Sequence, residues 1–225
     1  MMKNVVVVLA LVAAVSAASF AGTIASVDSY SVNSQLKTDG FPVTTSNSWA
    51  SKWTTDATVD SASLGASSNL GIPGTPASHQ YSAVGWQTGA EYFSFTVALT
   101  DGYAFGDDVE LIYGGLRGSS TGVKNGYTTV IVDGVETTVS SYSVPSSSYG
   151  NHIDDVAALL DGAKSVEVRF YGLGATASTG TYRIGDYYSS GNYTDMGLYG
   201  SVVAIPEPAT MALLGLGALV LRRKK

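Results

Sequence analysis

The chain has 225 residues and no cysteine, and 18 acidic side chains outnumber 12 basic ones, for a formal net charge of −6 at pH 7. The lack of cysteine excludes disulfides, thiolate metal sites and a cysteine nucleophile. Between the two ends of the chain, the acidic balance leaves no basic patch of the kind that phosphate binding needs, which excludes nucleic acid as a partner.

The N-terminal 21 residues have the layout of a secretory signal peptide. Lys3 supplies a positive charge, an apolar run follows over residues 5–15, and small side chains come next. We expect cleavage after Ala21, with Ala17 and Ala18 as alternative positions.

Residues 22–203 form the predicted ectodomain, a length that suits one domain with a substantial core. This stretch holds seven basic and seventeen acidic side chains, so its formal charge is near −10. Ser, Thr, Gly and Tyr dominate it. Because β-branched and aromatic side chains fit a pleated, half-buried surface, the composition indicates an all-β extracellular domain.

At the start of this domain, the alternation of apolar and polar residues is weak. Residues 23–32 alternate loosely and predict an edge strand, and residues 41–59 predict a strand or an irregular segment. Residues 61–80 are rich in Ser, Gly and Pro and predict a long loop.

Clear period-two alternation begins at residue 92. Phe93, Phe95, Val97 and Leu99 fall on one face, which predicts a half-buried strand. Asp133-Gly134 predicts a tight hairpin turn. The other predicted strands cover residues 109–113, 127–132, 135–142, 166–170, 182–184 and 198–203.

One helix is predicted, over residues 152–160. Its apolar side chains share a helical face, Asn151 is the expected N-cap, and Asp154 and Asp155 lie in the first turn. Many short strands, one brief helix and no βαβ rhythm predict an antiparallel β-sandwich, jelly-roll-like in its connections.

The C-terminal residues, 204–225, form a three-part segment. Pro206, Glu207 and Pro208 end the last strand, because proline cannot continue a strand or helix from that side. An uncharged run over residues 209–221 follows. The chain closes on a basic membrane-stop cluster of Arg222, Arg223, Lys224 and Lys225.

The apolar run predicts a short membrane helix. A helix of this length reaches roughly 20 Å, which is short of the ~30 Å hydrocarbon core. The positive-inside rule places the basic cluster in the cytoplasm and everything before Pro206 outside it.

These residues resemble the PEP-CTERM sorting signal of exported bacterial proteins. The resemblance implies recognition and cleavage near the motif by a membrane-embedded exosortase, in bacteria that make extracellular polysaccharide. It also implies transient anchoring in the inner membrane, followed by delivery to the cell surface or extracellular matrix.

The resemblance extends into the ectodomain. Sequence blocks at residues 92–97, 101–103, 116–122, 132–134, 166–172, 180–186 and 198–203 look like a module common in PEP-CTERM proteins. The module implies a jelly-roll-like sandwich without an established activity. Members often carry Arg-Ile-Asp-Asn where this chain has Gly185-Asp186, so a role for Asp186 does not carry over.

Two motifs imitate catalytic or nucleotide loops. Residues 118–122 read Gly-Ser-Ser-Thr-Gly, but no helix is expected after them, so a nucleophile elbow is not predicted. Residues 172–177 imitate a dinucleotide loop without the helix that should follow. The remaining catalytic option is a carboxylate pair for glycoside hydrolysis, drawn from Glu91, Glu110, Glu136 and Glu167.

A structural calcium ion is the one cofactor that the acidic body favours. Asp107-Asp108 and Asp154-Asp155 are the clusters in question, and neither has EF-hand spacing. Helix capping already explains the second pair, and the sequence defines no ligand set.

Exposed aromatic side chains are candidates for glycan contact. Flat aromatic faces pack well against other apolar faces. Tyr187-Tyr188, followed by Ser-Ser-Gly, is the best candidate. The wider set, for which core packing is the alternative, is Trp49, Trp53, Trp86 and Tyr193.

The sequence therefore predicts a non-enzymatic structural or adhesive protein of the cell surface or extracellular matrix. The alternative is a non-catalytic carbohydrate-binding module on the same scaffold. The expected partners are the processing enzyme, the membrane before processing, and extracellular polysaccharide.

Overall fold

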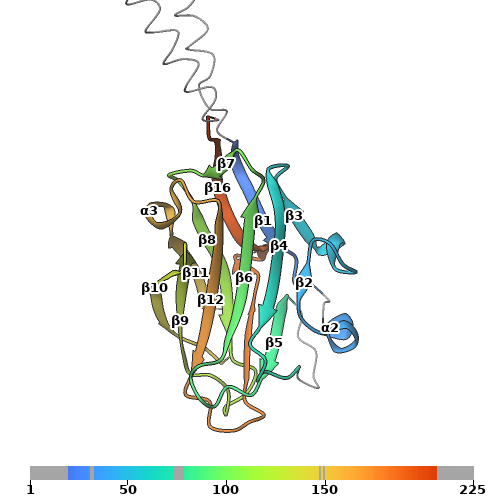
Figure 1. Ribbon diagram of the computed structural model, residues 1–225. Coiled ribbons are helices and arrows are strands. Elements are labelled where there is room, and N and C mark those ends of the chain that lie inside the picture. The colour runs from blue at the N-terminus through green and yellow to red at the C-terminus, as the bar shows by residue number, and fades with distance from the viewer. Residues whose placement is uncertain (1–19, 31–32, 73–78, 147, 149, 207–225) are drawn as a thin grey trace, which may run out of the picture.

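The structure is a computed structural model that describes residues 20–30, 33–72, 79–146, 148 and 150–206. In these residues the strands form two large antiparallel sheets that face each other, and a small separate hairpin (Figure 1). The predicted antiparallel β-sandwich is confirmed. The jelly-roll order of its connections stays a prediction.

The first sheet has eight strands and carries both ends of the described chain. Its main path runs β3-β1-β16-β8-β13-β5, with β11 on β8 and β7 on β16. The bounds are β1 Phe20–Val27, β3 Trp53–Thr55, β5 Gln80–Val84, β7 Tyr103–Phe105, β8 Glu110–Leu116, β11 Gly150–Asp155, β13 Thr181–Gly185 and β16 Met196–Ala204.

The second sheet has six strands in the order β10-β9-β12-β6-β4-β2. The bounds are β2 Val43–Thr44, β4 Val59–Ala66, β6 Tyr92–Leu99, β9 Asn125–Val132, β10 Val135–Ser143 and β12 Ser165–Leu173. The hairpin pairs β14 Tyr187–Ser189 with β15 Asn192–Thr194. The helical segments are α2 Asn33–Asp39, the 3₁₀ turn η1 Ala50–Lys52 and α3 Ala157–Leu160.

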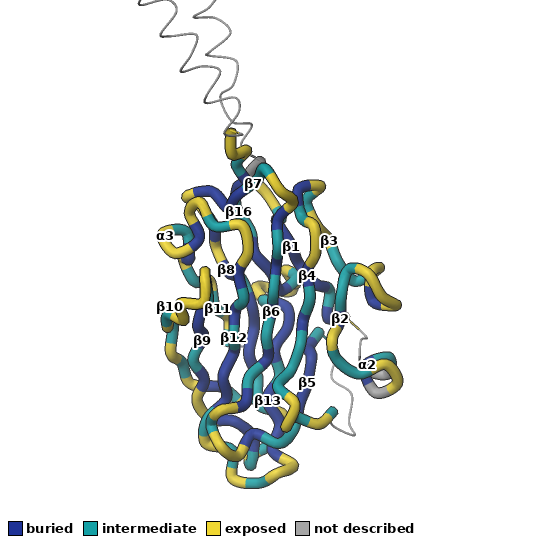
Figure 2. Tube along the Cα trace, viewed as in Figure 1, coloured by how far each residue is buried: buried dark blue, intermediate teal, exposed yellow. Residues whose placement is uncertain are grey.

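The core lies between the two sheets. Strand β6 shows why: its burial alternates strictly, with Phe93, Phe95, Val97 and Leu99 buried and the intervening side chains half-buried. Aromatic rings from the two sheets meet there, with Tyr113 of β8 packed edge-on to Phe170 of β12 at 4.8 Å. In Figure 2 the strands are mostly dark blue and teal, and yellow is commonest in the turns and loops.

Three local predictions differ from the structure. Residues 61–66 belong to β4 rather than to a loop, β1 lies between β3 and β16 rather than at an edge, and α2 was not expected. The segment from 41 to 59 is largely irregular, with only short strands and a 3₁₀ turn.

The predicted helix over residues 152–160 is wrong in its first half. Residues 150–155 form β11, paired in register with β8, and helix α3 begins only at Ala157. The His152 ring stacks on Tyr113 at 4.8 Å, and the Asp154 carboxylate accepts hydrogen bonds from Tyr113 and Ser140. Pairing with β8 and these side-chain contacts favour an extended conformation for residues 150–155, although the apolar side chains recur with a helical period.

Candidate functional site

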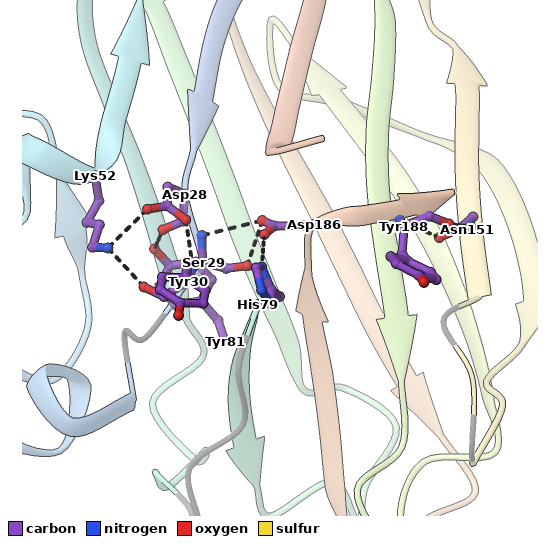
Figure 3. A network of polar contacts seen from close by, with 9 residues as sticks. All are labelled: Asp28, Ser29, Tyr30, Lys52, His79, Tyr81, Asn151, Asp186 and Tyr188. Atoms are coloured by element: carbon purple, nitrogen blue, oxygen red, sulfur yellow. Dashed lines mark hydrogen bonds and ion pairs between the residues drawn. The ribbon is translucent and has the colours of Figure 1, made fainter. Parts of the chain in front are cut away.

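Four residues from three distant regions of the sequence converge at one end of the β1–β16 pair. Asp28 follows β1, His79 precedes β5, Asp186 lies between β13 and β14, and Asp195 precedes β16. Figure 3 shows the polar contacts that join most of them. The site is thus built by the turns at strand ends rather than by a single loop.

The acidic cluster consists of Asp28, Asp186 and Asp195. One carboxylate oxygen from each lies within 4.8 Å of the others. Asp186 is buried, whereas Asp28 and Asp195 are half-buried. The sequence analysis did not group these three residues, because 158 positions separate Asp28 from Asp186 and no local motif connects them.

Asp186 is the best-connected member of the acidic cluster. Its Oδ1 accepts a hydrogen bond from Ser29 Oγ at 2.6 Å, and its Oδ2 lies 2.9 Å from His79 Nδ1. Its own amide donates to the carbonyl of His79 at 3.2 Å. Burial raises the pKa of Asp186 and outweighs the hydrogen bonds from Ser29 and His79, which lower it.

Asp28 ties the end of β1 to η1 and β5. Its Oδ2 forms an ion pair with Lys52 Nζ at 3.0 Å, and its Oδ1 accepts a hydrogen bond from the amide of Tyr30 at 2.7 Å. Its carbonyl accepts a hydrogen bond from the Tyr81 hydroxyl at 3.0 Å. Lys52 therefore offsets part of the negative charge of the acidic cluster.

Carboxylate oxygens suit a hard cation such as calcium, so the acidic cluster is the metal candidate that the structure offers among the described residues. Calcium takes six to eight oxygen ligands. Ser29 and His79 occupy both Asp186 oxygens, and Lys52 occupies one Asp28 oxygen. The cluster as it stands fits a cation incompletely.

The two acidic pairs singled out in the sequence have structural partners instead. The Asp108 carboxylate accepts hydrogen bonds from the amide and hydroxyl of Ser201. Asp154 accepts from Tyr113 and Ser140, and Asp155 accepts from the amide of Ala157 at 3.0 Å. These contacts give Asp108, Asp154 and Asp155 structural roles within the fold.

Asp195 gives a prediction on pH dependence. Burial, followed by repulsion from Asp186 and Asp28, raises its pKa to about 6. Because this pKa lies above that of the unfolded chain, folding favours the protonated form, and stability is lost as pH rises through 6. Asp195 is only half-buried, so we expect the free energy of unfolding to fall by about 1 kcal/mol from pH ~4.5 to ~7.

Urea unfolding of the wild type and of Asp195→Asn at both pH values measures this effect. The amide cannot titrate, so the difference between the two proteins isolates the contribution of Asp195. The same fall in both proteins would contradict the prediction.

A row of aromatic rings lies beside the acidic cluster; we call Tyr30, His79, Tyr193 and Tyr188 the aromatic row. The His79 ring stacks on Tyr193 with centroids 3.6 Å apart and planes 5° from parallel. Tyr30 lies 4.7 Å from His79 on one side, and Tyr188 lies 4.9 Å from Tyr193 on the other. The three tyrosines are exposed, at 54% for Tyr30, 43% for Tyr193 and 37% for Tyr188.

The β14–β15 hairpin holds one end of the aromatic row in place. Its turn contains Ser190 and Gly191, both at positive φ, the backbone geometry of a tight hairpin turn. Asn151 of β11 anchors it: the Asn151 side chain accepts a hydrogen bond from the Tyr188 amide at 3.0 Å and donates one to the Tyr188 carbonyl. The ring of Tyr188 is thus carried on a tethered, exposed hairpin.

Of the two predicted glycan contacts, Tyr188 lies in the aromatic row and Tyr187 is half-buried beside it. The tryptophans lie elsewhere. Trp49 and Trp86 are fully buried, and the half-buried Trp53 packs on Phe95 at 5.7 Å, so all three serve the core. Tyr30 and His79 were missed, because nothing in the local sequence places them in one row with Tyr193.

The four glutamates considered for hydrolysis do not share one place. Glu91 is buried and accepts hydrogen bonds from Thr88 and Gly89 in its own turn. Glu136 and Glu167 both contact Arg169 on the outer face of the second sheet. Glu110 belongs to β8 and is exposed. The Gly118–Gly122 stretch lies between β8 and β9, as expected of a loop.

Residues 204–225, which we call the sorting segment, begin at the opposite end of the same strand pair. Val202 pairs with Phe20 there, whereas Met196 pairs with Val27 at the end that carries Asp28 and Asp195. The eight residues of β1 span about 23 Å, at roughly 3.3 Å per residue. The aromatic row and the exit of the sorting segment are therefore well separated.

Pro206 is exposed and is the last described residue. Glu207, Pro208 and the basic cluster Arg222–Lys225 lie outside the described residues. Within the described part of the chain, no helix is both long and apolar enough to cross a membrane. The predicted cleavage after Ala21 would fall inside β1, whose pairing begins at Phe20.

Comparison with known proteins identifies the C-terminal segment. Residues 204–225 match the PEP-CTERM protein-sorting motif. The chain is therefore an exported protein that is transiently anchored in the membrane before an exosortase processes it. None of the curated proteins compared with the chain matches it.

Several solved structures resemble the body weakly. A family 29 carbohydrate-binding module complexed with mannohexaose is 11% identical, covers 65% of this chain and 84% of its own, and has a TM-score of 0.34. The K2 cleaved adhesin domain of Lys-gingipain is 11% identical, with coverages of 64% and 83% and a TM-score of 0.32.

A third structure, the enzymatically active domain of tailspike protein 4 from bacteriophage CBA120, is 12% identical. It covers 77% of this chain and 21% of its own, with a TM-score of 0.33. Likeness at this level carries no argument about ligand or activity.

Proposed function

We propose that the protein is a non-enzymatic structural or adhesive component of the cell surface or extracellular matrix, delivered there through its sorting segment. The observation that carries this proposal is the separation of two features on one strand pair. The sorting segment leaves one end of the β1–β16 pair, and the exposed aromatic row lies at the other. Delivery and contact therefore use different parts of the molecule.

The aromatic row is suited to contact with a partner. Three exposed tyrosines stand beside half-buried carboxylates, so a ligand there meets apolar ring surface and hydrogen-bond acceptors together. Tyr side chains give large contact area at low conformational cost. Ring contacts along the row and the Asn151 anchor of the hairpin hold the rings, which limits the ordering that binding would require.

The second candidate is a carbohydrate-binding module, and the same aromatic row favours it. Flat rings can lie against the apolar faces of pyranose sugars, and carboxylates accept hydrogen bonds from sugar hydroxyls. The acidic body disfavours anionic glycans through charge repulsion. A neutral polysaccharide is therefore the expected ligand in this case.

A glycan array with purified residues 20–206 separates the two candidates. This fragment keeps the full β1–β16 pairing, which a fragment starting at residue 22 would shorten. If the ligand is a glycan, Tyr188→Ala with Tyr193→Ala should weaken binding about tenfold, since two aromatic contacts of about 0.5–1.5 kcal/mol each are lost. The matched control is Tyr92→Ala, which removes a ring from the outer face of the second sheet.

Binding that survives in the double variant would contradict a glycan site at the aromatic row. If no glycan on the array binds, the structural or adhesive proposal remains, and its expected partners are proteins. Adding a chelator to the same array tests the acidic cluster, because only an ion-dependent ligand would be released.

A further inference from the structure

The last strand of the body is paired up to the residue that precedes the sorting motif. On one side β16 pairs with β7, in the register Val202–Phe105, Val203–Ala104 and Ala204–Tyr103. The amide of Ile205 then donates to the carbonyl of Gly102 at 2.7 Å. Figure 1 shows β7 and β16 together where the described chain ends.

No spacer separates this pairing from the motif. Ile205 is followed directly by Pro206, Glu207 and Pro208. Proline lacks an amide hydrogen and is disfavoured inside a β-ladder, so Pro206 and Pro208 favour an end to the pairing at Ile205. The segment that the processing enzyme must approach therefore begins where a folded sheet ends.

Peptide-binding proteins commonly take an extended segment as an added strand, through its backbone amides and carbonyls. Backbone groups already paired with β7 cannot pair with an enzyme as well. We propose that residues Val203–Ile205 form a latch on β7, and that processing requires this latch to open. The proposal rests on processing at the sorting motif and adds a requirement that the body imposes on it.

The burial of side chains along the end of β16 determines how far the latch can open. Ala204 and Ile205 are exposed and Val203 is half-buried, so these three residues can leave β7 without uncovering the core. Val202 and Ser201 are buried, and Val202 also pairs with Phe20 of β1, so the strand stays closed from there inward. Strand ends open more easily than strand centres.

Strand β7 itself stays in place when the latch opens. Ala104 and Phe105 are buried, the Phe105 amide donates to the carbonyl of Ala163, and the Gly162 amide donates to the carbonyl of Phe105. The movable partner is therefore the end of β16, which leads directly into the sorting segment.

A disulfide across the latch tests the proposal in the full-length protein. Tyr103→Cys with Ala204→Cys places two cysteines at directly paired positions of an antiparallel ladder, where the Cα separation suits a disulfide. The natural chain has no cysteine that could compete. In a host that carries the processing enzyme, pulse-chase labelling should show the oxidised protein processed at least tenfold more slowly than the wild type.

Three controls make the result specific. Each single cysteine variant, and the double variant after reduction, should be processed at the wild-type rate. A six-residue Gly/Ser insertion between Ile205 and Pro206 should restore processing of the oxidised variant, because the motif can then reach the enzyme while the latch is closed. Wild-type processing of the oxidised variant without the insertion would overturn the latch, and so would a block that the insertion does not relieve.

The experiment distinguishes a wrong assignment of the sorting motif from the absence of a latch, because the two give different processing results. If the motif is not the processing signal, its replacement by alanine leaves processing unchanged whether or not the latch is locked. Failure of the latch alone leaves the alanine variant unprocessed and the locked variant processed.

Discussion

Replacing Pro206, Glu207 and Pro208 by alanine is expected to leave an unprocessed, membrane-retained protein. The two prolines keep the segment from joining β16 or the following apolar run in one continuous element, and Glu207 places a charge at the entry to that run. With alanine, all three features are lost at once. We expect the processed fraction to fall at least tenfold, measured by pulse-chase labelling and membrane fractionation.

A matched control is Thr210→Ala, which lies beyond the motif in the same segment and should be processed normally. Glu207→Gln separates the charge from the two prolines. Normal processing of the triple alanine variant would contradict a role of the motif in sorting.

Asp186→Ala is expected to lower the free energy of unfolding by about 3 kcal/mol, because removal of one partner leaves buried polar groups unpaired. The buried carboxylate joins Ser29 to His79, and His79 in turn stacks on Tyr193. Its loss should therefore also loosen the aromatic row. Urea unfolding measures the stability, and hydrogen exchange of the β14–β15 hairpin measures the loosening.

Asp186→Asn is the matched control. The amide has the same shape, and it can accept from Ser29 with its oxygen and donate to His79 with its nitrogen. Burial already raises the pKa of Asp186, so the charge itself adds little, and we expect a change within about 1 kcal/mol. Equal losses in the two variants would show that the charge, rather than the hydrogen bonds, stabilises the site.

The sandwich could be predicted from the sequence because its strands carry a local signal. Phe93, Phe95, Val97 and Leu99 alternate strictly with polar or small neighbours, and the structure buries all four. Asp133-Gly134 was expected to turn between two strands, and both residues have positive φ between β9 and β10. These strands can be predicted from one sequence, because the spacing of the apolar side chains and the residue types at the turn indicate the same structure.

The β11 segment could not be predicted in the same way. Ile153, Val156, Ala157 and Leu160 fit a helical period, and Asn151 fits a cap. In the structure Asn151 instead holds the β14–β15 hairpin, and residues 150–155 pair with β8. Contacts with distant segments override the local preference here.

The candidate site is the least predictable part of the molecule. Tyr188 could be singled out, because two tyrosines before Ser-Ser-Gly suggest an exposed turn. The association of Asp28, Asp186 and Asp195 could not, since it arises where β1, β13 and β16 begin or end. Only the sheet order brings these three positions together.

Separate roles for the sorting segment and the aromatic row are tested most directly by the location of the protein on cells that export it. Full-length wild type, the triple alanine motif variant, the Tyr188→Ala/Tyr193→Ala variant and the Tyr92→Ala control would be followed by fractionation into membrane, cell surface and medium. We predict that the motif variant stays unprocessed in the membrane, while the double tyrosine variant is processed normally but lost to the medium. Retention of the double tyrosine variant at the surface, equal to that of the wild type and the control, would contradict contact through the aromatic row.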